Sequence, residues 1–253
     1  MDGAEVHRRG RLRVGVETPV GCGVVEKAVA VMWFVLVPGA CHGGWWFEPL
    51  ASELRAAGHR ADAVTLNGLD PDTAAPRAGI NLDDHIGQVV DVLTSRVDPV
   101  VLVGHSYAGS VITGVADRLP EQVHALVYLD AFVPEDGDSC WSMTNEEQRQ
   151  WYGTGSGRTG LAVDPLPFFS PLARPQPLGT LMQRSTLTGA YQKVRTRTYA
   201  LAADPEWVRH SPFVAVADRF RNNPAWAVVD LDATHNVLAR GTTTVRELIL
   251  THA

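Results

Sequence analysis

A serine stands where an apolar run meets a turn of small residues, in Gly-His-Ser-Tyr-Ala-Gly at residues 104–109. Residues 100–103 before it are all apolar, as expected of a parallel strand buried on both faces. The apolar periodicity of residues 110–119 predicts a helix directly after it. A serine on such a strand-to-helix turn projects its hydroxyl above the sheet edge, which is the geometry of a nucleophile elbow. The sequence therefore predicts Ser106 as a nucleophile.

The turn departs in one position from the Gly-x-Ser-x-Gly pattern of such elbows, because Ala108 stands in the last position and Gly109 follows it. Alanine is small enough to keep the turn, and the glycine at 104 lets two backbones approach closely. A bare match to the pattern arises often by chance, and the alternative is an ordinary turn. The predicted strand before the serine and helix after it favour the elbow.

A serine hydroxyl is a weak nucleophile and needs a neighbouring base, most often a histidine. Of the nine histidines, six lie away from any strand end downstream of the serine, His210 falls inside a predicted helix, and His252 lies at the terminus. His235 follows a predicted strand at residues 226–231, in a loop at the carboxyl edge of the sheet, where sites form in open α/β sheets. We therefore predict His235 as the general base rather than a surface histidine.

An acid must hold the imidazole in one tautomer and stabilise its protonated form. Asp204 follows a predicted strand at residues 196–202 and Asp130 follows another at residues 124–129, so both face the same sheet edge. The alternative for Asp204 is the N-cap of a predicted helix, and the alternative for Asp130 is a turn carboxylate. We favour Asp204 by a narrow margin and keep Asp130 open.

Negative charge that develops on a substrate oxygen needs backbone donors, which together form an oxyanion hole. The N–H of Tyr107, at the start of the helix after the serine, is one such donor. The second is expected from the loop after a predicted strand at residues 33–37, which reads Pro-Gly-Ala-Cys-His-Gly-Gly-Trp at residues 38–45. Small residues let an amide in this loop point at the serine, and the alternative is a tight glycine-rich turn.

The elements that must position these residues alternate between strand and helix. This rhythm predicts an α/β fold with a mostly parallel, doubly wound sheet. The rhythm breaks at residues 132–195, which are rich in proline and aromatic residues; we predict an inserted, partly helical cap over the sheet. The predicted strands are residues 33–37, 61–66, 100–103, 124–129, 196–202 and 226–231, and the predicted helices are residues 45–57, 82–96, 110–119, 205–221 and 237–250.

The first 31 residues differ from the rest of the chain. A basic stretch before the apolar run at residues 28–37 is similar to a signal peptide, but Glu26 and Lys27 precede that run directly and the run is short. We therefore predict a buried strand there. A further interpretation takes residues 1–31 as an N-terminal extension of one domain at residues 32–253. The sequence contains no stretch of about 20 apolar residues, the length that a transmembrane helix needs.

Composition and charge exclude several classes of protein. The 253 residues are 45% hydrophobic and 20% charged, which is typical of a globular protein and excludes a disordered chain. A net charge of −6 argues against a nucleic acid or an anionic membrane as partner. Three widely spaced cysteines fit neither a zinc site nor a disulfide framework, which favours a reducing, cytoplasmic compartment. We expect a small-molecule substrate, no cofactor and no metal, and the sequence leaves a homodimer open.

Three features together resemble one family of enzymes: residues 35–45, residues 104–109 and the late His235. They are similar to the α/β-hydrolases of the group that contains the plant methyl esterases of the salicylate-binding type, the hydroxynitrile lyases and many bacterial esterases. The resemblance runs from about Phe34 to the C-terminus and is weak over the predicted cap. It implies an α/β-hydrolase fold with Ser106 as nucleophile, His235 as base, and oxyanion-hole amides at Ala40 and Tyr107.

The resemblance also bears on the acid and on the reaction. The family's acid falls just after the strand equivalent to residues 196–202, which supports Asp204, although imperfect spacing keeps Asp130 open. The hydroxynitrile lyases carry a lysine directly after the catalytic histidine, and this chain has Asn236 there. The expected activity is therefore a serine carboxylesterase or methyl esterase that cleaves a small ester through an acyl-enzyme. The alternatives are a lyase or cyclase with the same site, or a ligand-binding protein without turnover.

Overall fold

One sheet of six parallel strands forms the centre of the molecule, in the order β2-β1-β3-β4-β7-β8. A computed structural model describes residue 1, residues 31–72 and residues 78–253. The predicted N-terminal extension therefore lies almost wholly outside the described residues, whereas the apolar run at residues 28–37 ends in the buried strand predicted there. The strands are β1 (Trp33–Val37), β2 (Arg60–Ala63), β3 (Val100–His105), β4 (Val123–Leu129), β7 (Thr196–Ala202) and β8 (Ala227–Leu231).

Burial explains why the central strands carry no polar alternation. Every residue of β1 and β3 is buried, because helices cover both faces of the sheet. The parallel register aligns Val37 with Gly104 and Leu129 with Ala200, so the carboxyl ends of the central strands meet at one edge. This is the edge at which the sequence places the serine, the histidine and both aspartates.

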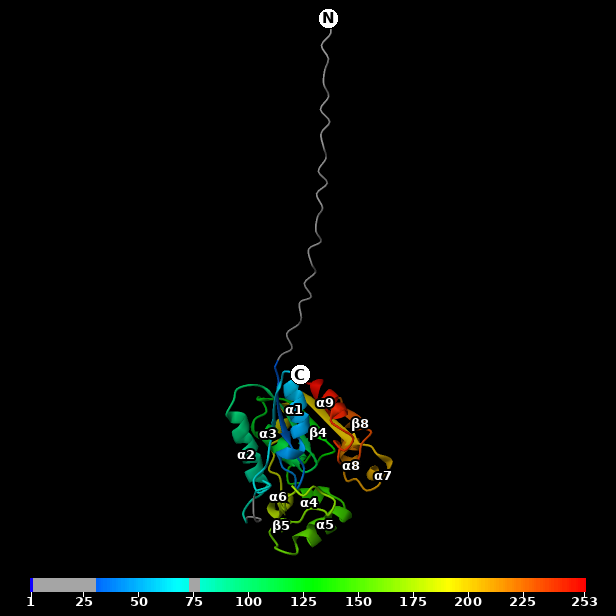
Figure 1. Cartoon of the computed structure of the whole chain (residues 1–253). Coiled ribbons are helices and arrows are strands. Elements are labelled where there is room, and N and C mark those ends of the chain that lie inside the picture. Colours follow the sequence, from blue (N-terminus) through cyan, green and yellow to red (C-terminus); the bar gives the residue numbers. More distant parts are fainter. Residues whose placement is uncertain (2–30, 73–77) are drawn as a thin grey trace.

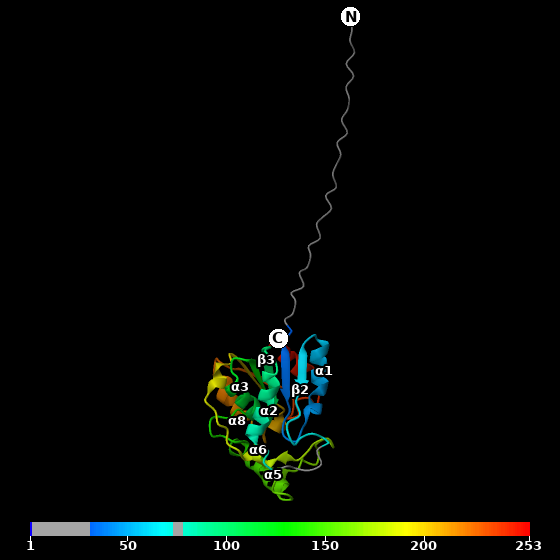
Figure 2. The same ribbon diagram turned by 90° about the vertical axis from the view of Figure 1, so that its left-hand side faces the viewer.

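The helices lie in two layers, as a doubly wound sheet requires. One layer packs α1 (Glu48–Ala56) and α9 (Thr243–Leu250) against one face, and the other packs α2 (Leu82–Thr94), α3 (Ala108–Arg118) and α8 (Val214–Arg221) against the opposite face. In Figure 2, α1 and α2 stand on opposite sides of the strands. The predicted α/β class with a mostly parallel sheet is confirmed. No helix among the described residues is long and apolar enough to cross a bilayer.

Residues 132–195, which we call the cap, leave the sheet at its carboxyl edge and return along α3 to its amino edge, where the Tyr191 N–H donates to Asp117 and β7 begins. Figure 1 shows the cap helices at the end of the molecule opposite the C-terminus. Two short antiparallel strands, β5 and β6, pair within the cap. The elements of residues 132–195 are α4 (Cys140–Met143), α5 (Glu146–Ser156), β5 (Ala162–Val163), β6 (Gln176–Pro177), α6 (Leu178–Met182) and the 3-10 helix η2 (Ala190–Lys193).

Three predicted helices differ markedly from those observed. The helix predicted at 205–221 is two helices, α7 (Pro205–Val208) and α8, because Pro212 lies between them; proline has no N–H and disfavours the helical conformation of the residue before it. The helix predicted at 237–250 begins only at Thr243, after Gly241, whose φ of 103° a helix cannot contain. The helix predicted at 45–57 is preceded by a 3-10 turn, η1 (Gly44–Trp46).

Candidate active site

Ser106 lies on a strained turn between β3 and α3. Its φ is 55°, a left-handed conformation that costs energy for any residue except glycine. Two backbone hydrogen bonds hold it there: the Ser106 N–H donates to the Leu129 carbonyl over 3.2 Å, and the Phe132 N–H donates to the Ser106 carbonyl over 3.1 Å. The end of the neighbouring strand β4 therefore fixes the serine, as an elbow requires.

The close approach of two backbones explains the unusual spacing of the glycines around this turn. A Cβ atom on Gly109 would lie 1.9 Å from the carbonyl oxygen of Phe132, far inside van der Waals contact. Ala108, in contrast, is the first residue of α3, where a methyl group is accommodated. The elbow thus requires glycine one position later than the common pattern places it.

A continuous hydrogen-bonded chain joins the serine to a histidine and a carboxylate. His235 Nε2 lies 3.0 Å from Ser106 Oγ, and His235 Nδ1 lies 2.7 Å from Asp130 Oδ2. The carboxylate of Asp130 is fully buried, and its Oδ1 accepts from the Ala202 N–H over 3.1 Å. A carboxylate acceptor keeps the proton on Nδ1, so the lone pair of Nε2 faces the serine hydroxyl.

The preference for Asp204 as the partner of His235 is wrong. Asp204 is the N-cap of α7, where its Oδ1 accepts from the N–H groups of Glu206 and Trp207 at 3.0 and 3.3 Å. Its own N–H donates to the carbonyl of Ala233, so the backbone directs the side chain toward the start of the helix. Asp130, with a φ of 44°, turns its carboxylate toward His235 instead.

Aromatic rings surround the imidazole of His235. Trp207 stacks on it with centroids 4.8 Å apart and Phe213 with centroids 5.2 Å apart. The ring of His105 lies 4.6 Å away, and its Nε2 donates to the His235 carbonyl over 2.8 Å. Burial, and then the nearby His235, lower the pKa of His105 well below its ordinary value, so the His105 ring that supports His235 is neutral near pH 7.

The two amides of the predicted oxyanion hole belong to residues close to Ser106. Tyr107 follows the serine directly, and a Cβ atom on Gly39, the residue before Ala40, would lie 3.0 Å from the Ser106 Cβ. Among the described residues, neither the Ala40 N–H nor the Tyr107 N–H donates to a protein acceptor. Cys41, which follows Ala40, has a φ of 67°, so the loop after β1 turns sharply here. These amides are therefore available to an oxygen atom of a bound substrate.

The cap fastens this loop from the other side. The Cys41 N–H donates to Gln176 Oε1 over 2.9 Å, and the Arg174 N–H donates to the Cys41 carbonyl over 2.9 Å. Gln176 is fully buried, and its Nε2 donates to Thr180 Oγ1 over 2.7 Å. Within the loop, His42 Nδ1 donates to the Ala40 carbonyl over 2.7 Å. The Ala40–Cys41 peptide, which directly follows the Ala40 N–H, is thus held by both the loop and the cap.

A buried histidine anchors the start of α3. The hydroxyl of Tyr107 donates to His85 Nδ1 over 2.8 Å, and His85 Nε2 donates to the Asn67 carbonyl over 2.9 Å. Burial lowers the pKa of His85 from 6.5 to about 4, so this histidine is neutral near pH 7. The sequence offered no pattern that would have identified His85, Gln176 or Trp207, because each makes its contact with a residue far away in the chain.

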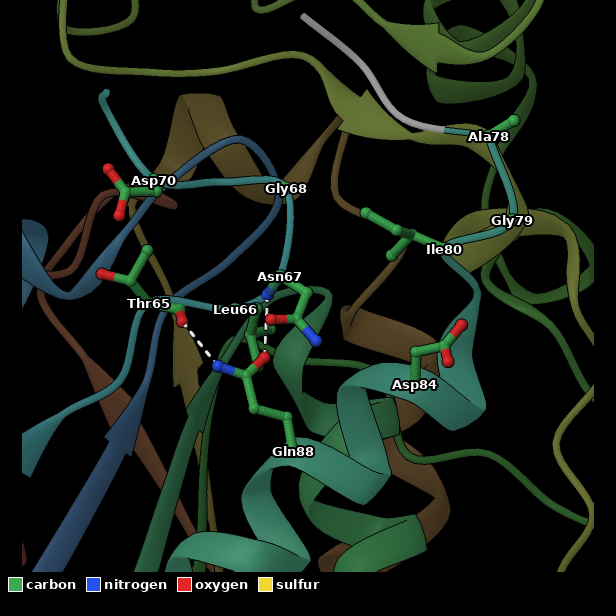
Figure 3. Close-up of a pocket in the computed structure, with 10 residues that line it drawn as sticks. All are labelled: Thr65, Leu66, Asn67, Gly68, Asp70, Ala78, Gly79, Ile80, Asp84 and Gln88. Atoms are coloured by element: carbon green, nitrogen blue, oxygen red, sulfur yellow. Dashed lines mark hydrogen bonds between the residues drawn. The ribbon is translucent and has the colours of Figure 1, made fainter. Parts of the chain in front are cut away.

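A separate pocket of about 600 Å³ lies between the loop after β2 and the start of α2 (Figure 3). Gln88 spans it, donating to the Thr65 carbonyl and accepting from the Asn67 N–H, over 2.9 and 2.8 Å. Asp84 accepts from the Asn81 N–H in the capping box that begins α2. These polar side chains hold the loop, and the residues that line the pocket do not include the serine, the histidine or Asp130.

The family model described as "Alpha/beta hydrolase family" matches residues 34–250. The chain belongs to the α/β-hydrolase family. The predicted family and fold are thus confirmed. Among curated relatives, this α/β-hydrolase is 37% identical to the carbendazim hydrolyzing esterase of Nocardioides sp. (strain SG-4G), over 81% of this chain and 93% of that protein. It is 34% identical to methylesterase 1 of Arabidopsis thaliana, over 54% of this chain and only 56% of that protein.

Solved structures agree with the fold of this α/β-hydrolase. An extracellular α/β-hydrolase from a Paenibacillus species superposes with a TM-score of 0.70 at 21% identity, over 88% of this chain and 99% of that chain. A pyrethroid hydrolase from Sphingobium faniae JZ-2 superposes with a TM-score of 0.68 at 20% identity, over 88% of this chain and 97% of that chain. At such identities the likeness concerns the fold alone.

Proposed function

We propose that the protein is a serine hydrolase that cleaves a small ester through an acyl-enzyme. The observation that carries the proposal is the hydrogen-bonded chain from Ser106 Oγ through His235 to the buried Asp130, beside two free amides. A nucleophile next to a base, with the base oriented by a third group, is the arrangement that activates a serine hydroxyl.

The reaction follows from the roles of these groups. As Ser106 Oγ attacks the ester carbonyl, His235 Nε2 accepts the hydroxyl proton, and Asp130 stabilises the imidazolium that forms. The amides of Ala40 and Tyr107 donate to the oxygen that becomes negatively charged. Nε2 then gives its proton to the departing alcohol, and a water activated by the same nitrogen releases the acid and frees the serine.

The named relatives support esters as the substrate class. The Nocardioides relative is an esterase that hydrolyses carbendazim, and the Arabidopsis relative is a methylesterase. Asn236 follows His235, so the positive side chain that the hydroxynitrile lyases of this group place there is missing. We therefore favour hydrolysis over cleavage of a cyanohydrin.

Hydrolysis of a short-chain nitrophenyl ester by the wild type and by Ser106→Ala tests the proposal. We expect the substitution to lower kcat by roughly a thousandfold or more, since loss of a catalytic serine removes the nucleophile. Circular dichroism checks that the variant is folded, and mass spectrometry of a trapped acyl-enzyme checks the covalent step on Ser106. Tight binding of esters without turnover, or full activity in Ser106→Ala, would contradict the proposal.

A further inference from the structure

Trp207 makes a hydrogen bond to the carboxylate that orients His235. Its indole Nε1–H donates to Asp130 Oδ2 over 2.9 Å, and the same oxygen accepts from His235 Nδ1. Because the carboxylate is fully buried, protein donors must replace the water that would otherwise solvate its charge. We propose that Trp207 is a positioning residue, which fixes the Asp130 carboxylate and, through it, the imidazole.

The ring of Trp207 acts on the imidazole as well. It stacks on His235 at 4.8 Å with an interplanar angle of 27°, and Phe213 stacks on the same imidazole at 5.2 Å and 10°. These contacts oppose rotation of the imidazole about its Cβ–Cγ bond. One side chain therefore holds both partners of the acid–base pair, Asp130 by its N–H and His235 by its face.

The local fold explains how Trp207 reaches this position. It lies in α7, a helix of only four residues that begins at the N-cap Asp204. Asp204 accepts from the backbone N–H of Trp207 itself and donates its own N–H to Ala233, two residues before His235. The aspartate that does not touch the imidazole thus ties the Trp207 helix to the loop that carries the histidine.

This inference rests on the proposed function, and Trp207→Phe tests it, because phenylalanine keeps an aromatic ring in this position and removes the indole N–H donor. We expect kcat for a nitrophenyl ester to fall by about tenfold to a hundredfold, the range for one hydrogen bond to a charged group. KM should stay unchanged, since Trp207 acts on the acid–base pair and not on substrate binding. Thermal unfolding of the variant establishes that it is folded.

Trp33→Phe is the matched control. Trp33 Nε1 donates to Asp62 Oδ2 over 2.7 Å, which is also an indole–carboxylate bond. Asp62 is exposed, and the bond lies at the amino end of β1, away from Ser106. We expect this variant to lose stability and to keep the wild-type kcat. A loss of activity that simply follows the loss of an indole–carboxylate bond would appear in both variants.

A double-mutant cycle separates positioning from general structural support. In an Asp130→Ala background the indole has no carboxylate to hold, so Trp207→Phe should no longer change kcat. The inference would be overturned if Trp207→Phe lowered kcat by the same factor in both backgrounds, or if Trp207→Phe alone kept the wild-type kcat. If Trp207→Phe does not fold, two variants of the N-cap Asp204 provide the test instead. We expect Asp204→Ala to lower kcat severalfold, and Asp204→Asn, which still caps α7, to keep the wild-type kcat. If Ser106→Ala still hydrolysed the nitrophenyl ester, the proposed function itself would be contradicted.

Discussion

Different parts of the molecule build the two sides of Ser106, the proposed acid–base side and the proposed oxyanion side. On the acid–base side, Asp130 and His235 follow β4 and β8, and α7 supports them, so every contributor belongs to the sheet and its helices. On the oxyanion side, the loop after β1 is completed by Gln176 of the cap, 135 residues further along the chain. The first side is a property of the sheet, whereas the second depends on a segment that lies over it.

This difference suggests that the two sides fail in different ways. Damage to the acid–base side removes a chemical group and should leave the fold intact. Damage to the oxyanion side displaces an amide that is still present, so its effect should depend on how firmly the cap is seated. Three experiments separate these outcomes, beginning with the largest expected effect.

Asp130→Asn should abolish most activity, and Asp204→Asn should not. An amide at position 130 favours the wrong imidazole tautomer, which lowers kcat by roughly 10³- to 10⁴-fold in a triad. Asparagine at 204 remains a good N-cap, so the second variant should keep kcat within about threefold. Steady-state kinetics with a nitrophenyl ester measures both, and equal losses in the two variants would contradict the assignment of the acid.

Gln176→Leu tests whether the cap supports the oxyanion hole. Leucine removes the acceptor of the Cys41 N–H, so the neighbouring amide of Ala40 is less firmly aimed; we expect kcat to fall about tenfold, less than the loss of a whole oxyanion donor. Gln122→Leu is the control, because Gln122 donates to the carbonyls of Leu93 and Arg96, far from the site. If both variants keep the wild-type kcat and lose the same stability, Gln176 does not support the oxyanion hole.

The smallest effect concerns pH and His85, which anchors Tyr107 on the oxyanion side. The folded protein keeps His85 neutral down to about pH 4, whereas the unfolded chain binds a proton near 6.5. The contribution of neutral His85 to the free energy of unfolding should therefore be fully present above pH 6.5. It should decline as the pH falls toward 4, by ~2 kcal/mol between pH 6.5 and 5. The free energy of unfolding, measured in urea at pH 7.5 and 5.0, should decrease more for the wild type than for His85→Gln. Identical decreases would show that His85 does not cause the pH dependence.

The juxtaposition of Ser106 and His235 could be predicted from the sequence because local patterns mark both positions. Buried parallel strands leave unbroken apolar runs, and Ser106 and His235 each follow such a strand at the carboxyl edge. The acid could not be decided, because Asp130 and Asp204 both follow strands at that edge. The direction of each side chain depends on the backbone, left-handed at Asp130 and capping a helix at Asp204.

Trp207 and Gln176 were beyond prediction for a different reason. Each acts on a residue distant in sequence, at separations of 77 and 135 residues. No helical or strand period connects such positions, so one sequence read by itself carries no trace of the pairing. The prediction of one helix at 205–221 also gave no reason to expect a contact between Trp207 and Asp130, because it placed Trp207 in a long helix rather than in the short α7.

Three residues with a left-handed backbone, Cys41, Ser106 and Asp130, follow or lie close to the ends of the adjacent strands β1, β3 and β4. Each conformation is unfavourable for a residue with a side chain and is tolerated because neighbouring bonds enforce it. A programme of laboratory evolution should therefore find these positions nearly immutable to valine or isoleucine. Exposed cap residues such as Phe168 and Leu172 should accept such substitutions more readily than these three positions.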